Sequence, residues 1–277
     1  MKRLLRALVL VSVVMAAMSG CQHDPAASLD RWMLERRSAT YRVPDAADRE
    51  ALSGAFAGSL AGRPASGWHA LAYESTTAGG HVAVRETDPA HRGWGAYAFR
   101  TAEARPLLVQ APHSESDRHS GEIAYALYRE TRARALAVNS AHRSLPQADQ
   151  ASADGPFTVL TREALRERAD SVVLQVHGFG ADTAARYGLS ASTLVASNGT
   201  RVPDAALREV AACLREAGFD ARLFPEEAPY PGGTRNAVGQ AVREVPAARF
   251  MHFEMGADLR QELLTRPERV EAFAACL

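Results

Sequence analysis

Two histidines that follow apolar runs are the residues of this chain best suited to bind a metal ion. Residues 107–111 form an apolar run that ends at Pro112, and His113 and Asp117 follow it. A second apolar run, residues 171–176, ends at His177. Because ligands of open α/β sheets gather outside the carboxyl ends of strands, we expect these segments to meet. Two imidazoles and one carboxylate then bind zinc and leave a fourth position open, as in catalytic zinc sites.

The identity of the carboxylate ligand has two interpretations. Glu115 lies in the same loop as Asp117, so either side chain could reach an ion bound by His113. We prefer Asp117, because a His and an Asp four residues apart in a tight loop can reach the same ion. A polar loop whose histidines cap the following helix is the structural alternative.

A glutamate also ends the last apolar run of the chain. Glu254 closes the segment Met-His-Phe-Glu, where a dry and unpaired carboxylate would cost several kcal/mol. A neighbouring zinc site explains such a residue, since a carboxylate beside a metal-activated water can accept its proton. The alternative is a structural salt bridge to Arg260.

Several side chains near these elements are candidates to bind a substrate carboxylate. A guanidinium can hold a carboxylate through two parallel hydrogen bonds. The candidates are Arg143, Asn139, Arg235, Asn236 and Arg260. Arg143 and Asn236 are preferred, because they lie in turn-like segments, where binding residues are common.

The elements that would position these residues alternate along the chain. Residues 68–100 alternate apolar and polar side chains between glycine turns, which predicts antiparallel strands at one edge of a sheet. After residue 107, strands alternate with helices, which favours parallel pairing with helices on both faces. The predicted fold class is α/β: a single mixed, mainly parallel sheet flanked by helices, with an antiparallel hairpin at its edge.

The first residues are typical of a bacterial export signal. A basic start precedes an apolar stretch, residues 7–17, that is too short to cross a membrane. Residues 18–21, Met-Ser-Gly-Cys, resemble the lipobox of bacterial lipoproteins, which implies cleavage before Cys21 and attachment of lipid, with palmitate among its acyl chains. Gln22 then favours the outer membrane, facing the periplasm or the cell surface. An ordinary cleaved signal is the alternative.

This signal defines three predicted parts of the chain. Residues 1–20 are a lipoprotein signal peptide, residues 21–65 a tether with short helices, and residues 66–277 the catalytic domain. The domain is large enough to bury a substantial core.

Composition limits the function classes. The 32 basic and 32 acidic residues cancel, so the chain lacks the net basic character that nucleic-acid binding normally needs. The absence of a CxxC pair argues against a zinc finger or a thioredoxin-like redox site. Cys213 and Cys276 could pair in an oxidising periplasm, and two separate buried thiols are the alternative.

Several short motifs, taken in order, resemble a known group of enzymes. They are Gln-Ala-Pro-His113 with Asp117, Asn139 with Arg143, Val-His177-Gly, Gly-Thr-Arg235-Asn236, and His-Phe-Glu254 followed by Leu-Arg260. Over residues 94–264 the set resembles the N-formylglutamate amidohydrolases and related zinc carboxypeptidases, including poly-γ-glutamate hydrolases. The resemblance implies a phosphorylase/hydrolase-like fold, zinc held by His113, Asp117 and His177, a general base at Glu254, and arginines that bind a carboxylate. Ser116 departs from the pattern, because it replaces the glutamate of the carboxypeptidase pair His-x-x-Glu.

Together these features predict an envelope-anchored, zinc-dependent hydrolase with one zinc per chain. It would cleave a peptide, γ-glutamyl or N-acyl amino acid amide with metal-activated water. The expected partners are an amide substrate that bears a carboxylate, and the membrane, reached through the lipid anchor. The alternative is a non-catalytic lipoprotein that binds envelope components on a hydrolase scaffold, because a fold does not dictate function. The sequence leaves the substrate and the oligomeric state open.

Overall fold

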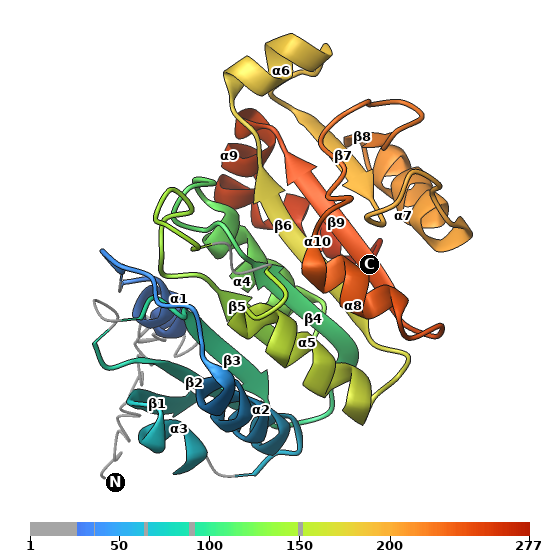
Figure 1. The fold of residues 1–277 in the computed structure, drawn as a ribbon. Coiled ribbons are helices and arrows are strands. Elements are labelled where there is room, and N and C mark those ends of the chain that lie inside the picture. Colours follow the sequence, from blue (N-terminus) through green and yellow to red (C-terminus); the bar gives the residue numbers. More distant parts are fainter. Residues whose placement is uncertain (1–26, 36, 64–65, 89–91, 149–151) are drawn as a thin grey trace, which may run out of the picture.

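The computed structural model describes residues 27–277, apart from residues 36, 64–65, 89–91 and 149–151 (Figure 1). The predicted signal peptide and Cys21 lie outside the described residues. Within the described part of the chain, no helix combines the length and apolar character that a membrane crossing needs.

Nine described strands form one mixed sheet in the order β1-β2-β3-β5-β4-β6-β9-β7-β8. Their bounds are β1 Tyr73–Ala78, β2 His81–Glu86, β3 Ala96–Arg100, β4 Arg105–Ala111, β5 Ala133–Val138, β6 Val172–Gly178, β7 Thr193–Ser197, β8 Asp220–Leu223 and β9 Arg249–Met255. The antiparallel strands expected at one edge are present as β1, β2 and β3.

The expectation of a mainly parallel sheet is wrong. Of the eight strand pairings described, β4 with β5, β4 with β6, β6 with β9 and β7 with β8 are parallel, and the other four are antiparallel. The antiparallel partner that sequence patterning misses is β7, which runs against β9. All five residues of β7 are buried, so its apolar run gives no sign of strand direction.

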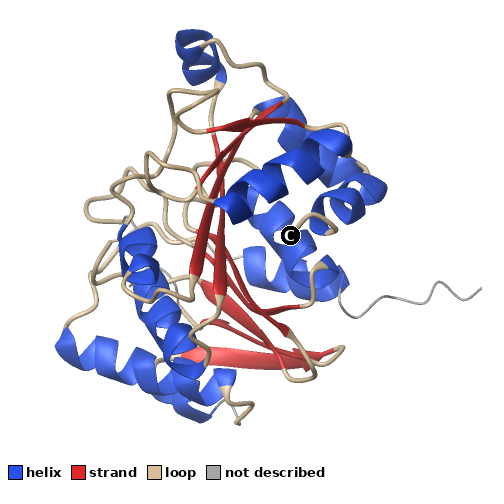
Figure 2. Cartoon of the chain, turned by 90° about the vertical axis from the view of Figure 1, so that its right-hand side faces the viewer, coloured by secondary structure: helices blue, strands red, loops and turns tan. Residues whose placement is uncertain are grey.

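Helices cover both faces of this sheet, as expected (Figure 2). The helices are α1 Ala27–Leu34, α2 Ala46–Leu60, α3 Ser66–Ala70, α4 Ser120–Glu130, α5 Pro156–Glu167, α6 Ala181–Tyr187, α7 Ala205–Glu216, α8 Ala237–Arg243, α9 Ala257–Thr265 and α10 Pro267–Ala274. One apolar core lies between the sheet and α1, α4, α7, α9 and α10, and a second core lies between the opposite face and α2, α3, α5 and α8.

The central strands β4, β6 and β9 are parallel neighbours, so their carboxyl ends lie at the same edge of the sheet. Their register pairs Gln110 with Gln175, Gln175 with His252, and His177 with Glu254. The strand ends that carry the predicted site residues are therefore adjacent.

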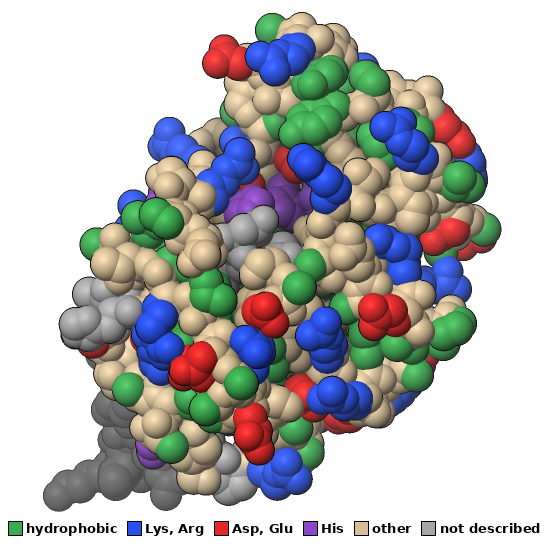
Figure 3. Space-filling view, in the orientation of Figure 1, with side chains coloured by type: hydrophobic (Ala, Val, Ile, Leu, Met, Phe, Trp, Pro, Cys, Tyr) green, Lys and Arg blue, Asp and Glu red, His purple; other side chains and the backbone are tan. Residues whose placement is uncertain are grey.

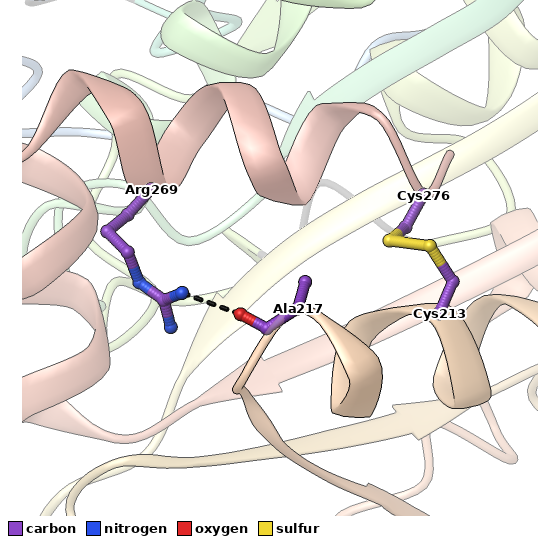
Figure 4. The surroundings of a disulfide bond; sticks show 4 residues. All are labelled: Cys213, Ala217, Arg269 and Cys276. Atoms are coloured by element: carbon purple, nitrogen blue, oxygen red, sulfur yellow. Dashed lines mark hydrogen bonds between the residues drawn. A yellow bond between two sulfur atoms is a disulfide. The ribbon is translucent and has the colours of Figure 1, made fainter.

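A disulfide joins Cys213 on α7 to Cys276, which follows α10 (Figure 4). The two Cα atoms are 5.6 Å apart, within the usual range for a bridge. Nearby, Arg269 Nη1 donates a hydrogen bond of 2.7 Å to the carbonyl of Ala217. Of the two arrangements that the sequence leaves open for these cysteines, the structure has the bridged one, which ties the end of the described chain to α7.

Candidate metal centre

The loop after β4 turns sharply and brings His113 and Asp117 to the same side. The backbone amides of Ser116 and Asp117 both donate to the carbonyl of His113, at 2.8 and 2.7 Å. This turn is braced from below, because Asn139 Nδ2 donates to the carbonyl of Pro112 at 2.8 Å. The His113 side chain is half-buried and that of Asp117 is buried, so both are held in fixed positions.

Three ligand atoms from two strand ends converge at this turn. His177 Nδ1 lies 3.1 Å from His113 Nδ1, and Asp117 Oδ2 lies 3.6 Å from His113 Nδ1 and 3.7 Å from His177 Nδ1. Ligands about 2.0–2.1 Å from a tetrahedral zinc ion are about 3.3–3.4 Å from one another. The spacing and the donor set of two imidazoles and one carboxylate therefore fit a small divalent cation.

Asp117 is held in its ionised form. Burial alone would raise the pKa of Asp117, but its interactions with the nearby imidazoles of His113 and His177 outweigh burial and hold that pKa well below its usual range. The backbone N–H of Gly178 also donates to Asp117 Oδ2 at 3.0 Å, and Arg143 Nη1 lies 3.6 Å from Oδ1. An ionised carboxylate beside two imidazole nitrogens is the protonation state that a metal site needs.

Glu254 faces the same cluster from β9. Burial, reinforced by the negative charge of Asp117, raises the pKa of Glu254 to about 8. Its closest ion-pair contact among the described residues is His252 Nε2, at 3.8 Å. Glu254 is thus a mostly buried carboxyl beside the candidate metal ligands, which is a placement suited to a general base.

The proposed alternative partner of Glu254, Arg260, is engaged elsewhere. Its guanidinium donates to the backbone carbonyls of Arg118 at 2.8 Å, Phe179 at 3.3 Å and Met255. No ion pair between Glu254 and Arg260 occurs in the described chain within 4.0 Å. Arg260 therefore fastens the loop after β4 to the end of β6, and it still contributes positive charge near the cluster.

The glycine after His177 is required by this arginine. A Cβ built on Gly178 would clash with Arg260 Nη1, far inside van der Waals contact. A side chain at this position would displace the guanidinium and with it the loop that carries Asp117.

A cavity of about 410 Å³ opens onto the cluster. Its lining includes Asp117 and Glu254 on the floor and Arg118, Arg143 and Tyr230 nearer the rim. Figure 3 shows histidine side chains in this hollow with basic side chains around it. Helix α6, which stands above the end of the sheet in Figure 1, contributes Thr183 to the wall. The cavity combines a polar floor with basic groups at its mouth.

Other predicted site residues lie outside this cavity. Glu115 points to Arg37, with its Oε2 3.0 Å from Arg37 Nε, and lines a neighbouring cavity instead. Asn139 braces loops below the cluster, and Asn236 caps α8 by accepting a hydrogen bond from the N–H of Gly239. Arg235 also lies outside the cavity, because it is exposed on the turn before α8 and does not line the cavity wall.

Two residues of the site were missed by sequence reasoning. His252 is buried with its ring 4.4 Å from that of His177, and its Nδ1 has no hydrogen-bond partner in the described chain. Gln175 accepts a hydrogen bond from His177 Nε2 at 3.3 Å. Each lies two residues before a predicted site residue on the same strand, and the two-residue period of strands places such pairs on one face. That period was the available signal.

No protein-family model and no curated protein matches this chain. Solved structures similar to it include N-formylglutamate amidohydrolase from Ralstonia eutropha JMP134, with 13% identity and a TM-score of 0.43 over 65% of this chain and 96% of that one. A bacteriophage poly-γ-glutamate hydrolase shares 14% identity, with a TM-score of 0.40 over 65% of this chain and 88% of that one. The zinc-free form of YNDL shares 15% identity, with a TM-score of 0.42 over 63% and 84%. The first two names are those of the groups that the motifs resemble.

Proposed function

We propose that this protein is a zinc-dependent hydrolase that cleaves an amide bond in a substrate bearing a carboxylate. The observation that carries the proposal is the convergence of His113, Asp117 and His177 beneath an open cavity that Glu254 also lines. Three protein ligands with an accessible side are typical of catalytic zinc sites. A zinc ion held there supplies a Lewis acid that polarises a carbonyl and acidifies water.

Glu254 is proposed to move the proton. A carboxyl whose pKa lies near neutrality both accepts and releases a proton easily around pH 7. Glu254 is placed to accept a proton from the attacking water and to return it to the nitrogen of the leaving amine. Its carboxyl lines the cavity beside the proposed ligands, where a substrate and the attacking water would meet it.

Arg143 is the proposed contact for the substrate carboxylate. Its side chain is 55% exposed at the rim of the cavity, while one nitrogen stays within 3.6 Å of Asp117. A guanidinium with this exposure can turn toward a carboxylate that enters the cavity. Arg260 instead holds the backbone through the three carbonyls described above and is not needed as a substrate contact.

Elemental analysis of the purified full chain, combined with hydrolysis assays, tests the proposal. About one zinc per chain is expected, together with chelator-sensitive cleavage of a γ-glutamyl peptide, an ordinary peptide or an N-acyl amino acid. His113→Ala and His177→Ala should each lose the zinc and the activity. His142→Ala is the matched control, because this exposed histidine lines the same cavity outside the cluster. Stoichiometric zinc without any turnover would instead favour the envelope-binding alternative.

We also propose that the protein is exported and anchored at the cell envelope through Cys21. Support comes from the lipobox-like residues 18–21 and from the Cys213–Cys276 disulfide, since such bonds persist in oxidising compartments. Wild-type protein should fractionate with membranes, and Cys21→Ser should release it or leave it unprocessed. Soluble wild-type protein with an unmodified Cys21 would contradict the anchor.

A further inference from the structure

Amide side chains form a hydrogen-bonded row directly beneath the metal cluster. Gln110 on β4 and Gln175 on β6 are opposite one another in the parallel register, and both are fully buried. Asn236, at the start of α8, reaches Gln175 from the other side. Buried amides are costly unless each donor and acceptor finds a partner, so the orientation of every group in such a row is determined by its neighbours.

The orientation of this row of amides is fixed at one end by a backbone carbonyl. Thr161 Oγ1 donates to the carbonyl of Phe157 at 2.8 Å, which leaves its oxygen to accept from Gln110 Nε2 at 3.0 Å. Gln110 must therefore turn its Oε1 toward Gln175, whose Nε2 donates to it at 2.9 Å. Gln175 then presents its own Oε1 on the opposite side.

A backbone amide fixes the same orientation independently. The N–H of Gly239 donates to Asn236 Oδ1 at 3.2 Å, so the amide nitrogen of Asn236 faces Gln175. This Nδ2 donates to Gln175 Oε1 at 2.6 Å. Two separate anchors thus direct the carbonyl oxygen of Gln175 the same way.

The Oε1 atom of Gln175 lies 3.3 Å from His177 Nε2. A carbonyl oxygen only accepts, so the contact is a hydrogen bond when Nε2 carries the proton of the neutral ring. Nδ1 is then left with its lone pair, and it is Nδ1 that lies 3.1 Å from His113 Nδ1 and 3.7 Å from Asp117 Oδ2. The tautomer that Gln175 selects is the one that a metal ion at the cluster needs.

We propose that Gln175 is a positioning residue that holds His177 in the Nε2–H tautomer and so presents Nδ1 to the metal. This inference rests on the proposed metal site. Gln110 and Asn236 act as its two anchors, and either anchor alone is sufficient to keep Gln175 oriented. Partners of this kind typically change metal affinity by about 10- to 100-fold when they are removed.

The test compares matched substitutions in the full chain. Gln175→Met keeps an unbranched side chain of similar length but removes the acceptor that faces His177. Gln110→Met removes the same kind of buried amide from the neighbouring strand and leaves Gln175 held by Asn236. Both variants leave buried polar atoms without partners, so both should unfold at lower urea concentration than the wild type.

Zinc affinity and the ring tautomer separate positioning from a loss of stability. By competition with a chelator, Gln175→Met should bind zinc about 10- to 100-fold more weakly, and Gln110→Met should stay within about 3-fold of the wild type. The ring ¹⁵N shifts of His177 in the metal-free wild type should report Nε2–H. An Nδ1–H ring there would refute the inference even if Gln175→Met does not fold.

Three results would overturn the inference: an Nδ1–H tautomer in the metal-free wild type, unchanged zinc affinity in Gln175→Met, or an equal loss of affinity in Gln110→Met. A wild-type chain that binds no zinc would contradict the proposed function instead. The ring shifts would still show which nitrogen of His177 carries the proton, so the two failures are distinguishable.

Discussion

Replacing Glu254 with Gln should abolish most turnover while the metal and the fold remain. Gln has the same shape but cannot accept a proton. General acid–base catalysis typically contributes about 10²- to 10⁴-fold to a rate, so kcat should fall by about that factor. The fall corresponds to about 3–5 kcal/mol of activation free energy. Zinc content should stay near one per chain, because the proposed ligands are His113, Asp117 and His177 and do not include Glu254.

The stability of the metal-free protein should change little in this variant. Burial raises the pKa of Glu254 to about 8, so in the metal-free protein near pH 7 the carboxyl is largely protonated and resembles the amide. Arg260 loses no partner, since its hydrogen bonds go to backbone carbonyls. If Glu254 and Arg260 were instead a buried ion pair, removing one charge would cost about 3–5 kcal/mol of unfolding free energy.

Turnover, zinc content and urea unfolding, measured on the same preparation, separate these cases. Glu86→Gln is the matched control: burial also raises the pKa of this carboxyl, to about 7, but it forms a 3.1 Å ion pair with Arg92. It lies five strands from β9, or about 24 Å at about 4.8 Å per strand. The control should lose stability and keep its activity. A destabilised Glu254→Gln protein with near-normal specific activity in its folded fraction would refute a catalytic role.

Three further predictions follow from other parts of the structure. Asp117→Asn should lose zinc, as measured by elemental analysis, while Glu115→Gln should retain it; the reverse result would exchange the two roles. Removing the bridge with Cys213→Ser and Cys276→Ser frees a 63-residue loop, which lowers the unfolding free energy by about 4 kcal/mol in the chain-entropy model. Tm should fall by about 10 °C, and a reductant added to the wild type should have the same effect. Burial, assisted by nearby arginines, lowers the pKa of His81 to about 4, so the unfolded chain binds its proton first as the pH falls. Stability is therefore lost between about pH 6.5 and 4, and His81→Gln should lose less unfolding free energy from pH 7 to 5 than the wild type does.

Much of the fold could be predicted because its signals are local. Period-two segments between glycine turns identify β1, β2 and β3, and abrupt changes from apolar to polar residues mark the ends of β4 and β6. The direction of β7 could not be predicted, since both faces of this strand are buried and burial removes the alternation that would distinguish it. An antiparallel strand inserted beside β9 depends on long-range pairing, which no short segment encodes.

The site residues likewise fall into some that local sequence predicts and others that it does not. His113, Asp117 and His177 are found from chemistry at strand ends, because carboxyl ends of parallel neighbours share one edge. Which carboxylate lies nearer His113 depends on the side of one turn that each faces, and the structure places Asp117 beside His113 and Glu115 beside Arg37. Asn139 and Asn236 illustrate the converse, because turn residues suited to binding a ligand are equally suited to bracing a loop or capping a helix.

Strand register explains why the remaining site residues require the structure. Gln110, Gln175 and His252 occupy one row across β4, β6 and β9, and His177 and Glu254 occupy the next row toward the carboxyl edge. A slip of one residue between β6 and β9 would turn Glu254 to the opposite face of the sheet, away from His177. Hydrogen bonds at both ends of the pair, from Arg249 N to Ser171 O and from Phe179 N to Met255 O, hold the register. The strand register therefore places Gln110, Gln175 and His252 directly beneath His177 and Glu254, and it is this long-range pairing, absent from any short segment, that brings Gln175 within reach of His177.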